Sequence, residues 1–294
     1  MMELSEMIER ARQMRGRDRF GVVEDGDFEG FDQVSMEDMK VRAGEFEVHM
    51  IRFTPPSPRE DRPMFVNFHG GGFIKGRYRR DDLFCCKLAT ILGCEVVDMD
   101  YSLTPENPFP YAVNEMYEAV KWLFGQAESW GVDRTRIVLG GQSSGGNLVC
   151  TTLLKNNGQD AIQPCAAVLC WTPLDLFTDP ETKPRPERDM PADRAKLYNS
   201  FYCAPEDADN VLVSPIFADE AQLKTFPKTM FIIAGQDSLA AEDEMFAGKL
   251  IHAGVEVAAR RFEDSMHGFM INRMDEWEEA FEYLLRYLRE VFEK

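Results

Sequence analysis

The chain has 294 residues, 44% of them hydrophobic, and its 51 Asp and Glu outnumber its 33 Lys and Arg, which gives a formal net charge of -18. This length and hydrophobic content allow a large buried core, and the acidic balance argues against binding to nucleic acid or to anionic membranes. The sequence has no run of 18 apolar residues, and acidic residues stand near its start where a signal peptide would be basic. We therefore expect no membrane association and a cytoplasmic location.

Strand-like apolar runs alternate with helical patterns along most of the chain. The expected strands are Met64–Phe68, Arg136–Gly140, Thr229–Gly235 and Val255–Phe262. The expected helices are Asp81–Leu92, Ala112–Trp130, Asn147–Leu154, Glu242–Ala253 and Trp277–Phe292. Such alternation predicts a single α/β domain over residues 1–294, with a mostly parallel central sheet covered by helices on both faces.

A glycine-rich loop, His69-Gly70-Gly71-Gly72, follows the first of these strands. Glycines there allow backbone N–H groups to approach a substrate oxygen, so the N–H groups of Gly71 and Gly72 are candidate oxyanion donors. A plain turn or a phosphate-binding loop are the alternatives. A phosphate loop would need a nearby Lys-Ser/Thr or a G-x-G-x-x-G pattern, and the residues after Gly72 contain neither.

Ser143 lies in the sequence Gly141-Gln142-Ser143-Ser144-Gly145, between an expected strand and an expected helix. A serine at so sharp a turn is exposed above the edge of the sheet, and the flanking glycines allow strand and helix to approach each other closely. This pattern predicts a nucleophile elbow, with the N–H of Ser144 as a third oxyanion donor. Alone the pattern is weak, but here it follows a glycine-rich loop.

The general base and its acid partner are expected after the later strands. His267 is the candidate base, because His49 and His252 lie in positions typical of surface residues and His69 belongs to the oxyanion loop. Asp237, two residues beyond the strand Thr229–Gly235, is the candidate acid that orients the imidazole.

Asp264 is the alternative acid, three residues before His267. We rank it below Asp237 because it shares the loop of His267, where a local turn hydrogen bond is its more natural role. The resulting order along the chain is serine, acid, histidine, with the glycine loop upstream of the serine. That order is typical of α/β-hydrolases.

The chain resembles the hormone-sensitive-lipase-like family of α/β-hydrolases, in particular small bacterial acetyl-esterase-like carboxylesterases. Besides the glycine loop, the serine elbow, Gly235-Gln236-Asp237 and His267-Gly268-Phe269, the resemblance covers three further segments. They are Asp100-Tyr101-Ser102-Leu103-Thr104-Pro105-Glu106, Phe109-Pro110 and Ser214-Pro215, and the resemblance extends from about Phe46 to the C-terminus. It implies a Ser143–His267–Asp237 triad that hydrolyses short-chain acyl esters through an acyl-enzyme.

The sequence departs from this family at three positions, none of them in the triad. Gln142 stands where the family usually has Asp or Thr, Ser144 where it has Ala, and Ser102 where it has Arg. Any ion-pair network built on that Arg is therefore absent. Phe73, Phe269 and Met270 flank the motifs and are candidate pocket residues, although they can equally belong to the core.

Two segments do not fit the sheet-and-helix pattern, namely residues 1 to about 42 and about 175 to 210. The first opens with an apolar stripe at helical spacing, made of Leu4, Met7, Ile8, Ala11 and Met14. The second contains an aromatic cluster of Tyr198, Phe201 and Tyr202. In the resembled family both regions form a helical cap over the serine, and the alternative is a solvated helix and a surface loop.

The seven cysteines are odd in number and lack the spacing of metal ligands, so no metal or organic cofactor is expected. The expected partner is a small-molecule ester, and a homo-oligomer is possible. Two other functions stay open. One is an arylformamidase or other amidase that uses the same triad, and the other is a catalytically silent binding module on the same fold.

Overall fold

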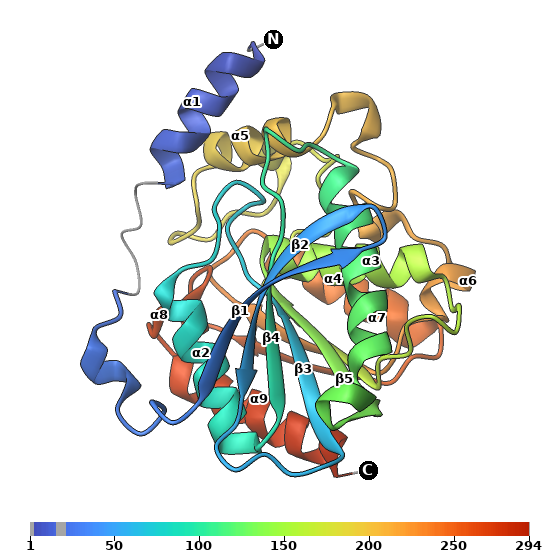
Figure 1. The fold of residues 1–294 in the computed structure, drawn as a ribbon. Coiled ribbons are helices and arrows are strands. Elements are labelled where there is room, and N and C mark those ends of the chain that lie inside the picture. Colours follow the sequence, from blue (N-terminus) through green and yellow to red (C-terminus); the bar gives the residue numbers. More distant parts are fainter. Residues whose placement is uncertain (1–2, 16–21, 294) are drawn as a thin grey trace.

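The structure, a computed structural model, describes residues 3–15 and 22–293 and contains one eight-stranded sheet within them (Figure 1). The strand order is β1-β2-β4-β3-β5-β6-β7-β8, and the strands from β4 to β8 are parallel to one another. β2 pairs antiparallel with both β1 and β4. The strands are β1 Ser35–Ala43, β2 Phe46–Thr54, β3 Arg62–Phe68, β4 Glu95–Asp100, β5 Val132–Gln142, β6 Ala166–Cys170, β7 Thr229–Ala234 and β8 Val257–Phe262.

Helices cover both faces of the sheet and enclose two hydrophobic cores. On one face lie α3 Tyr111–Gln126, α4 Ser144–Asn156 and α7 Ala240–His252, with the short α6 Glu220–Leu223 beside α7. On the other lie α2 Arg79–Leu92, α8 Phe269–Asn272 and α9 Trp277–Phe292. In α9 the buried residues recur every three or four positions from Ala280 to Phe292, because one face of the helix packs on the sheet.

The expected α/β architecture is therefore present, and the expected strands and helices lie within a few residues of their predicted bounds. One helix is shorter than predicted: α3 ends at Gln126, and a separate 3-10 turn, Glu128–Trp130, follows before Gly131 takes a left-handed conformation. The expected cap segment of residues 1 to about 42 also overlaps the sheet, because β1 begins at Ser35 and pairs along its length with β2.

Two helices lie together beyond the carboxyl ends of the parallel strands (Figure 1). They are α1 Leu4–Arg15 and α5 Ala192–Tyr202. Ala11 of α1 is fully buried in a small apolar cluster with Ile74 and Phe201, and Met7, Met14, Leu197 and Tyr198 pack around it. The predicted apolar stripe of α1 is thus partly buried against α5, although Leu4 stays 57% exposed.

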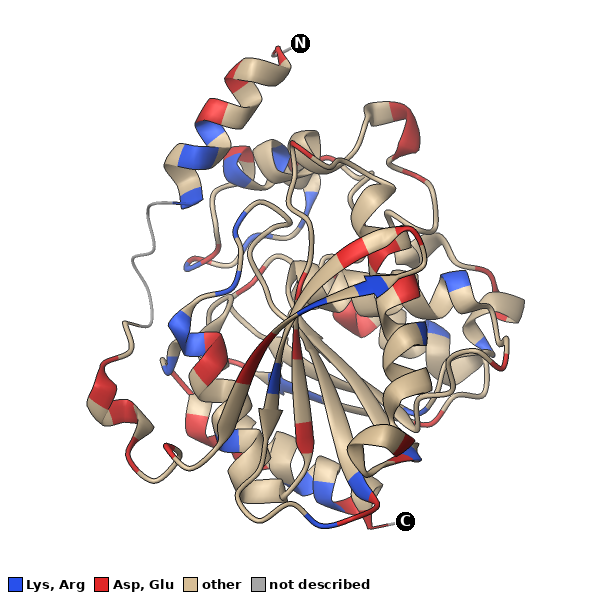
Figure 2. Ribbon diagram, viewed as in Figure 1, with Lys and Arg blue, Asp and Glu red and all other residues tan. Residues whose placement is uncertain are grey.

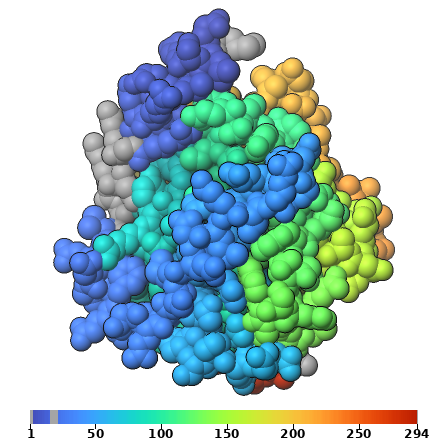
Figure 3. Space-filling model, in the orientation of Figure 1, coloured from blue at the N-terminus to red at the C-terminus, as the bar shows by residue number. Residues whose placement is uncertain are grey.

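Arg15 fixes the end of α1 to the loops above the sheet. Its Nη atoms donate to both carboxylate oxygens of Glu106, at 2.8 and 2.7 Å, and its Nε donates to the carbonyl of Ile74 at 2.7 Å. A further bond of 2.9 Å reaches the carbonyl of Thr104. Figure 3 shows α1 lying directly against the surface of these loops.

Acidic residues are spread over many helices, strands and loops of the ribbon (Figure 2). All seven cysteines are free thiols, and all but Cys165 are buried. Within residues 3–15 and 22–293, no helix has both the length and the apolar character needed to cross a membrane.

Candidate active site

Ser143 lies at the sharp turn between β5 and α4, with φ 52° and ψ −124°. A positive φ is unfavourable for a residue with a side chain, so the surrounding contacts must hold it. The N–H of Ser143 donates to the carbonyl of Cys170 at 2.9 Å, and its own carbonyl accepts from the N–H of Asn147 at 3.2 Å. The turn therefore projects the Ser143 hydroxyl above the sheet.

The two flanking glycines are required by close backbone contacts. A Cβ on Gly145 would lie 1.9 Å from the carbonyl oxygen of Phe68, and one on Gly141 would lie 2.4 Å from the backbone of Gly145. Neither distance is compatible with a side chain. The expectation that glycines allow β5 and α4 to converge here agrees with this geometry.

His267 and Asp237 complete a continuous chain of hydrogen bonds that ends at Ser143. His267 Nε2 lies 2.9 Å from Ser143 Oγ, and His267 Nδ1 lies 2.6 Å from Asp237 Oδ2. Asp237 is only 2% exposed, and its other carboxylate oxygen accepts the N–H of Leu239 at 3.1 Å. With Nδ1–H donating to Asp237, Nε2 is left to accept the serine proton.

Asp264, the alternative acid, is part of a different set of bonds. Its N–H donates to Glu276 Oε2 at 3.1 Å, and its carbonyl accepts from Arg188 at 2.6 Å. Among the described residues its carboxylate makes no hydrogen bond to His267. The structure thus brings Asp237, and not Asp264, to the imidazole.

The charges around His267 raise its pKa. Burial by itself would lower the pKa of His267, but the charge of Asp237 and the hydrogen bond to it raise the pKa above its ordinary value of 6.5. Among weaker influences, the charge of Asp189 raises the pKa and that of Arg194 lowers it. The imidazole is consequently a stronger base than it would be in the same pocket without Asp237.

The glycine loop and the start of α4 face the same space as the Ser143 hydroxyl. Gly71 and Gly72 have φ of 143° and 61°, and both line the pocket beside Ser143. The carbonyl of Gly71 accepts from Ile74 and Lys75, which closes the loop. Among the described residues no acceptor is bound to the N–H groups of Gly71, Gly72 or Ser144, so these three donors are available to an oxygen in the pocket.

His69 holds the glycine loop in place through buried contacts. It is fully buried, its Nδ1 lies 2.8 Å from the carbonyl of Gly70, and its ring stacks on Tyr101 with 4.4 Å between centroids. Burial would raise the pKa of Asp100, but the nearby His69, 3.7 Å away, and the hydrogen bond with His49 lower the pKa to about 2. The role expected for His69, structural support of the loop, agrees with these contacts.

The three sequence departures from the family pattern have identifiable partners. Gln142 donates to Asn67 at 2.8 Å, and Asn67 donates to the buried Asp98 at 2.6 Å. Ser102 donates to Glu115 through both its N–H and its hydroxyl, each at 2.8 Å. The hydroxyl of Ser144 lies 3.2 Å from that of Tyr101, below the pocket floor.

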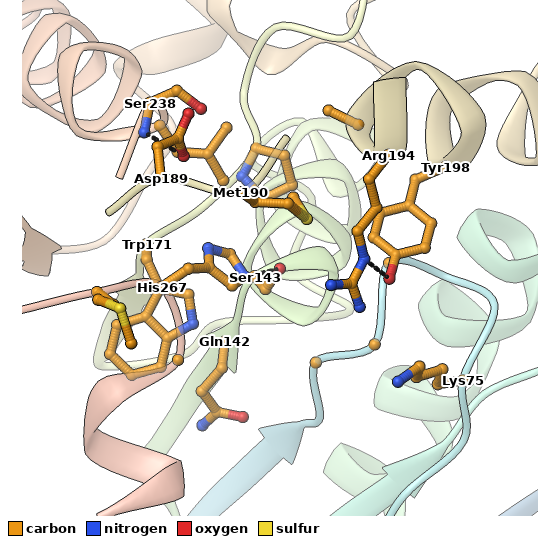
Figure 4. Close-up of a pocket in the computed structure, with 18 of the residues that line it drawn as sticks. Lys75, Gln142, Ser143, Trp171, Asp189, Met190, Arg194, Tyr198, Ser238 and His267 are labelled. Atoms are coloured by element: carbon orange, nitrogen blue, oxygen red, sulfur yellow. Dashed lines mark hydrogen bonds between the residues drawn. The ribbon is translucent and has the colours of Figure 1, made fainter. Parts of the chain in front are cut away.

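The Ser143 hydroxyl opens into a pocket of about 360 Å³ (Figure 4). Phe73, one of the candidate pocket residues, lines the pocket and stacks on Tyr202 with 3.7 Å between centroids. The pocket assignments of Phe269 and Met270 are wrong. Their side chains are 0% and 3% exposed in the core beneath α2 and α9, because the short helix after His267 turns them toward the sheet.

Sequence reasoning missed Trp171 and Arg194 as pocket residues and placed Tyr198 only in the expected cap segment. Trp171 follows β6 and places its ring 6.5 Å from that of His267. Arg194 and Tyr198, one helical turn apart on α5, form the wall opposite, and α1 lines no part of this pocket. The i, i+4 spacing of Arg194 and Tyr198 marked a shared helix face, but nothing in the sequence showed which surface that face covers.

Comparisons with known proteins agree with the fold and with the order of the motifs. A family model described as the alpha/beta hydrolase fold matches residues 65–271. An arylesterase of Saccharolobus solfataricus is 30% identical over 239 residues, which are 79% of this chain and 76% of that protein.

Solved structures agree as well. A hyperthermophilic esterase from the archaeon Pyrobaculum calidifontis is 27% identical with a TM-score of 0.81, over 98% of this chain and 94% of that one. A bacterial heroin esterase is 29% identical with a TM-score of 0.78, over 89% of this chain and 86% of that one. The chain therefore belongs to the α/β-hydrolase family, in its hormone-sensitive-lipase-like group.

Proposed function

We propose that this carboxylic ester hydrolase cleaves short-chain acyl esters, from acetyl to butyryl, through Ser143, His267 and Asp237. The observation that carries the proposal is the unbroken hydrogen-bond chain from Asp237 through His267 to Ser143 at the floor of an open pocket. The similarity to proteins named esterase supports the ester as substrate, and the resemblance to acetyl-esterase-like enzymes supports a short acyl chain.

The proposed mechanism assigns a group to each step. Ser143 Oγ attacks the ester carbonyl carbon while His267 Nε2 takes the hydroxyl proton, and the resulting oxyanion accepts hydrogen bonds from Gly71, Gly72 and Ser144. Collapse of the tetrahedral intermediate breaks the C–O bond, and His267 returns the proton to the leaving alcohol. Water then attacks the acyl-enzyme by the same steps and releases the acid.

We also propose that α1 and α5 together form the cap over this site. α5 lines the pocket through Arg194 and Tyr198, and α1 packs on the outer side of α5. A cytoplasmic location and a homo-oligomeric state remain predictions.

A panel of p-nitrophenyl acetate, butyrate, octanoate and dodecanoate tests the proposal, together with acetylated sugars and formylkynurenine. We expect the highest kcat/KM at acetate or butyrate and no turnover by Ser143→Ala. A maximum at octanoate or above would contradict the short-chain assignment. Faster turnover of formylkynurenine than of any ester would favour the arylformamidase alternative.

A further inference from the structure

The walls of the pocket carry more positive than negative side chains, although the whole chain is strongly acidic. Its charged lining residues among those described are Lys75, Arg80, Lys183, Arg188 and Arg194, against Asp81, Asp175 and Asp189. The local balance is therefore opposite in sign to the formal charge of -18. Because salt screens distant charges over about 8 Å, nearby groups dominate what a ligand in the pocket experiences.

Carboxylates outside the pocket already pair with some of these cations. Lys183 Nζ lies 2.6 Å from Glu242, and Arg188 lies 2.8 Å from Asp275. Arg194 differs from them. Its Nε donates to the Tyr198 hydroxyl at 3.0 Å, and no carboxylate of the described residues forms an ion pair with its guanidinium.

Arg194 is also well placed relative to the reacting atoms. In the view of Figure 4 its guanidinium and the His267 ring lie on opposite sides of Ser143. The ring of Tyr198 packs against the oxyanion loop, where a Cβ on Gly72 would lie 3.0 Å from it. The bond from Nε to Tyr198 therefore holds the guanidinium near the loop, and neither Nη group takes part in it.

We propose that Arg194 is a specificity-determining residue that binds a carboxylate on the substrate, so that the preferred esters carry a second, anionic group. The inference rests on the proposed function at Ser143. A guanidinium forms two parallel hydrogen bonds with a carboxylate, and a side chain already held by Tyr198 loses less freedom on binding. The carboxylate can belong to either half of the ester, and the test separates the two.

Two matched substrate pairs provide the test, each followed as kcat/KM by proton release. Methyl butyrate and monomethyl succinate differ by a carboxylate in the acyl half, whereas phenyl acetate and 4-acetoxybenzoate differ by one in the alcohol half. The variants are Arg194→Gln and Arg194→Lys. Arg286→Gln on α9 is the control, since Arg286 also lies over a tyrosine, 5.4 Å from the ring of Tyr283.

We expect the wild-type enzyme to prefer the anionic member of one pair, and Arg194→Gln to lower kcat/KM for that ester about five- to tenfold. The ratio of kcat/KM for the anionic ester to kcat/KM for its neutral partner should fall by the same factor in Arg194→Gln, Arg194→Lys should be intermediate, and Arg286→Gln should behave as wild type. The pair that responds identifies the half of the ester that carries the carboxylate. Added NaCl should reduce the preference by screening the pair.

Two results would overturn the inference: no preference for the anionic ester in either pair, or equal losses on neutral and anionic esters in Arg194→Gln. The second would show that Arg194 only supports the pocket wall. Failure of the proposed function looks different, because the wild-type enzyme would then leave all four esters intact or Ser143→Ala would retain activity.

Discussion

At the residue scale, the two adjacent serines of the elbow have separate surroundings. Ser143 has the strained backbone conformation and its hydroxyl meets His267, whereas the hydroxyl of Ser144 points to the buried Tyr101. A positive φ of this kind costs on the order of 1–3 kcal/mol and persists only where neighbouring contacts hold it. The strain therefore belongs to the residue that presents its hydroxyl to the pocket.

We predict that Ser143→Ala abolishes ester hydrolysis and that Ser144→Ala retains most of it. Ser144 contributes its backbone N–H, which alanine keeps, and the loss of its hydrogen bond to Tyr101 should cost about 1 kcal/mol of stability. Steady-state assays on p-nitrophenyl butyrate measure the effect. A fluorophosphonate adduct mapped by mass spectrometry to Ser144 would contradict the assignment.

The pKa of His267 sets the expected pH dependence. The imidazole must be neutral to accept the serine proton, so kcat/KM should rise with pH through a single ionisation above 6.5. Asp237→Asn should lower kcat by about 10⁴ by analogy with a serine protease triad. It should also shift the ionisation to lower pH, because burial and Arg194, which lower the pKa, then act without that carboxylate.

Asp264→Asn is the matched control for this prediction, since Asp264 makes its bonds through its backbone. It should leave both kcat and the pH profile near the wild-type values. A severe loss in Asp264→Asn together with a mild one in Asp237→Asn would reverse the assignment of the acid.

At this scale, the sequence predicted the approach of the motif residues better than it predicted which residues line the pocket. The motif positions of Ser143, Asp237 and His267 imply close approach because each follows a strand whose carboxyl end lies at one edge of the sheet. Pocket residues depend on the rotation of short local elements, which the sequence pattern does not define. Phe73 and Phe269 both adjoin a motif, yet only Phe73 reaches the pocket.

At the scale of elements, the approach of β5 and α4 depends on Gly145. We predict that Gly145→Ala lowers the free energy of unfolding by on the order of 1–3 kcal/mol and impairs catalysis, because the added Cβ would overlap the carbonyl oxygen of Phe68. Gly125→Ala in α3 is the control. Apart from its own helix backbone and chain neighbours, no atom of the described residues lies within 4 Å of its added Cβ, so it should stabilise the protein by about 0.5–1 kcal/mol.

Urea unfolding followed by circular dichroism measures both variants. Equal stability of Gly145→Ala and the wild-type protein would show that the elbow can relax without this glycine.

The proposed cap leads to a prediction about α1. Deleting residues 1–15 removes the cover over Phe201 and Ile74, so α5 loses support on its outer side while the triad stays in the sheet. We expect a raised KM, an altered chain-length preference and retained fluorophosphonate labelling of Ser143. Arg15→Ala should reproduce part of the effect by removing the bonds to Glu106 and Ile74.

Arg12→Ala is the control for charge, since it removes one arginine from the same helical turn. A folded truncated enzyme with the parent's KM for every ester would identify α1 as an appendage without influence on the site.

The sequence predicted the bounds of single elements better than it predicted which elements pack against each other. The bounds of α9 match the prediction because its apolar residues repeat within one continuous helix. The pairing of β1 with β2 and the contact of α1 with α5 join segments whose partners are specified only by the folded chain. Those features could not be derived from local pattern.

At the scale of the whole molecule, His49 links its two neighbouring strands, because its ring is hydrogen-bonded to one carboxylate on each. It lies on β2, with Nε2 2.7 Å from Asp38 of β1 and Nδ1 2.6 Å from Asp100 of β4. Burial would lower the pKa of His49, but its hydrogen bonds to the two carboxylates raise the pKa above 6.5. A raised pKa in the folded state stabilises the fold below the unfolded pKa, and this contribution is lost as pH rises through the folded pKa.

We therefore predict that the free energy of unfolding falls as pH rises from about 6 to 8, and that the growing negative charge adds to this trend. His49→Gln should flatten the pH dependence by removing the titrating group. Urea unfolding at several pH values, compared between wild type and variant, measures the slope. An identical slope in His49→Gln would show that other groups dominate it.

The site is divided between the central sheet and helix α5, and this division has a consequence for how such enzymes diverge. Ser143, Asp237 and His267 all follow strands of one sheet, whereas the wall with Arg194 and Tyr198 belongs to a single helix, α5. Mutations that alter the inner face of α5 can change which ester is accepted without disturbing the chemistry. Substrate range and reaction type can thus be inherited separately, and exchanging one eleven-residue helix between relatives is a direct route to new selectivity.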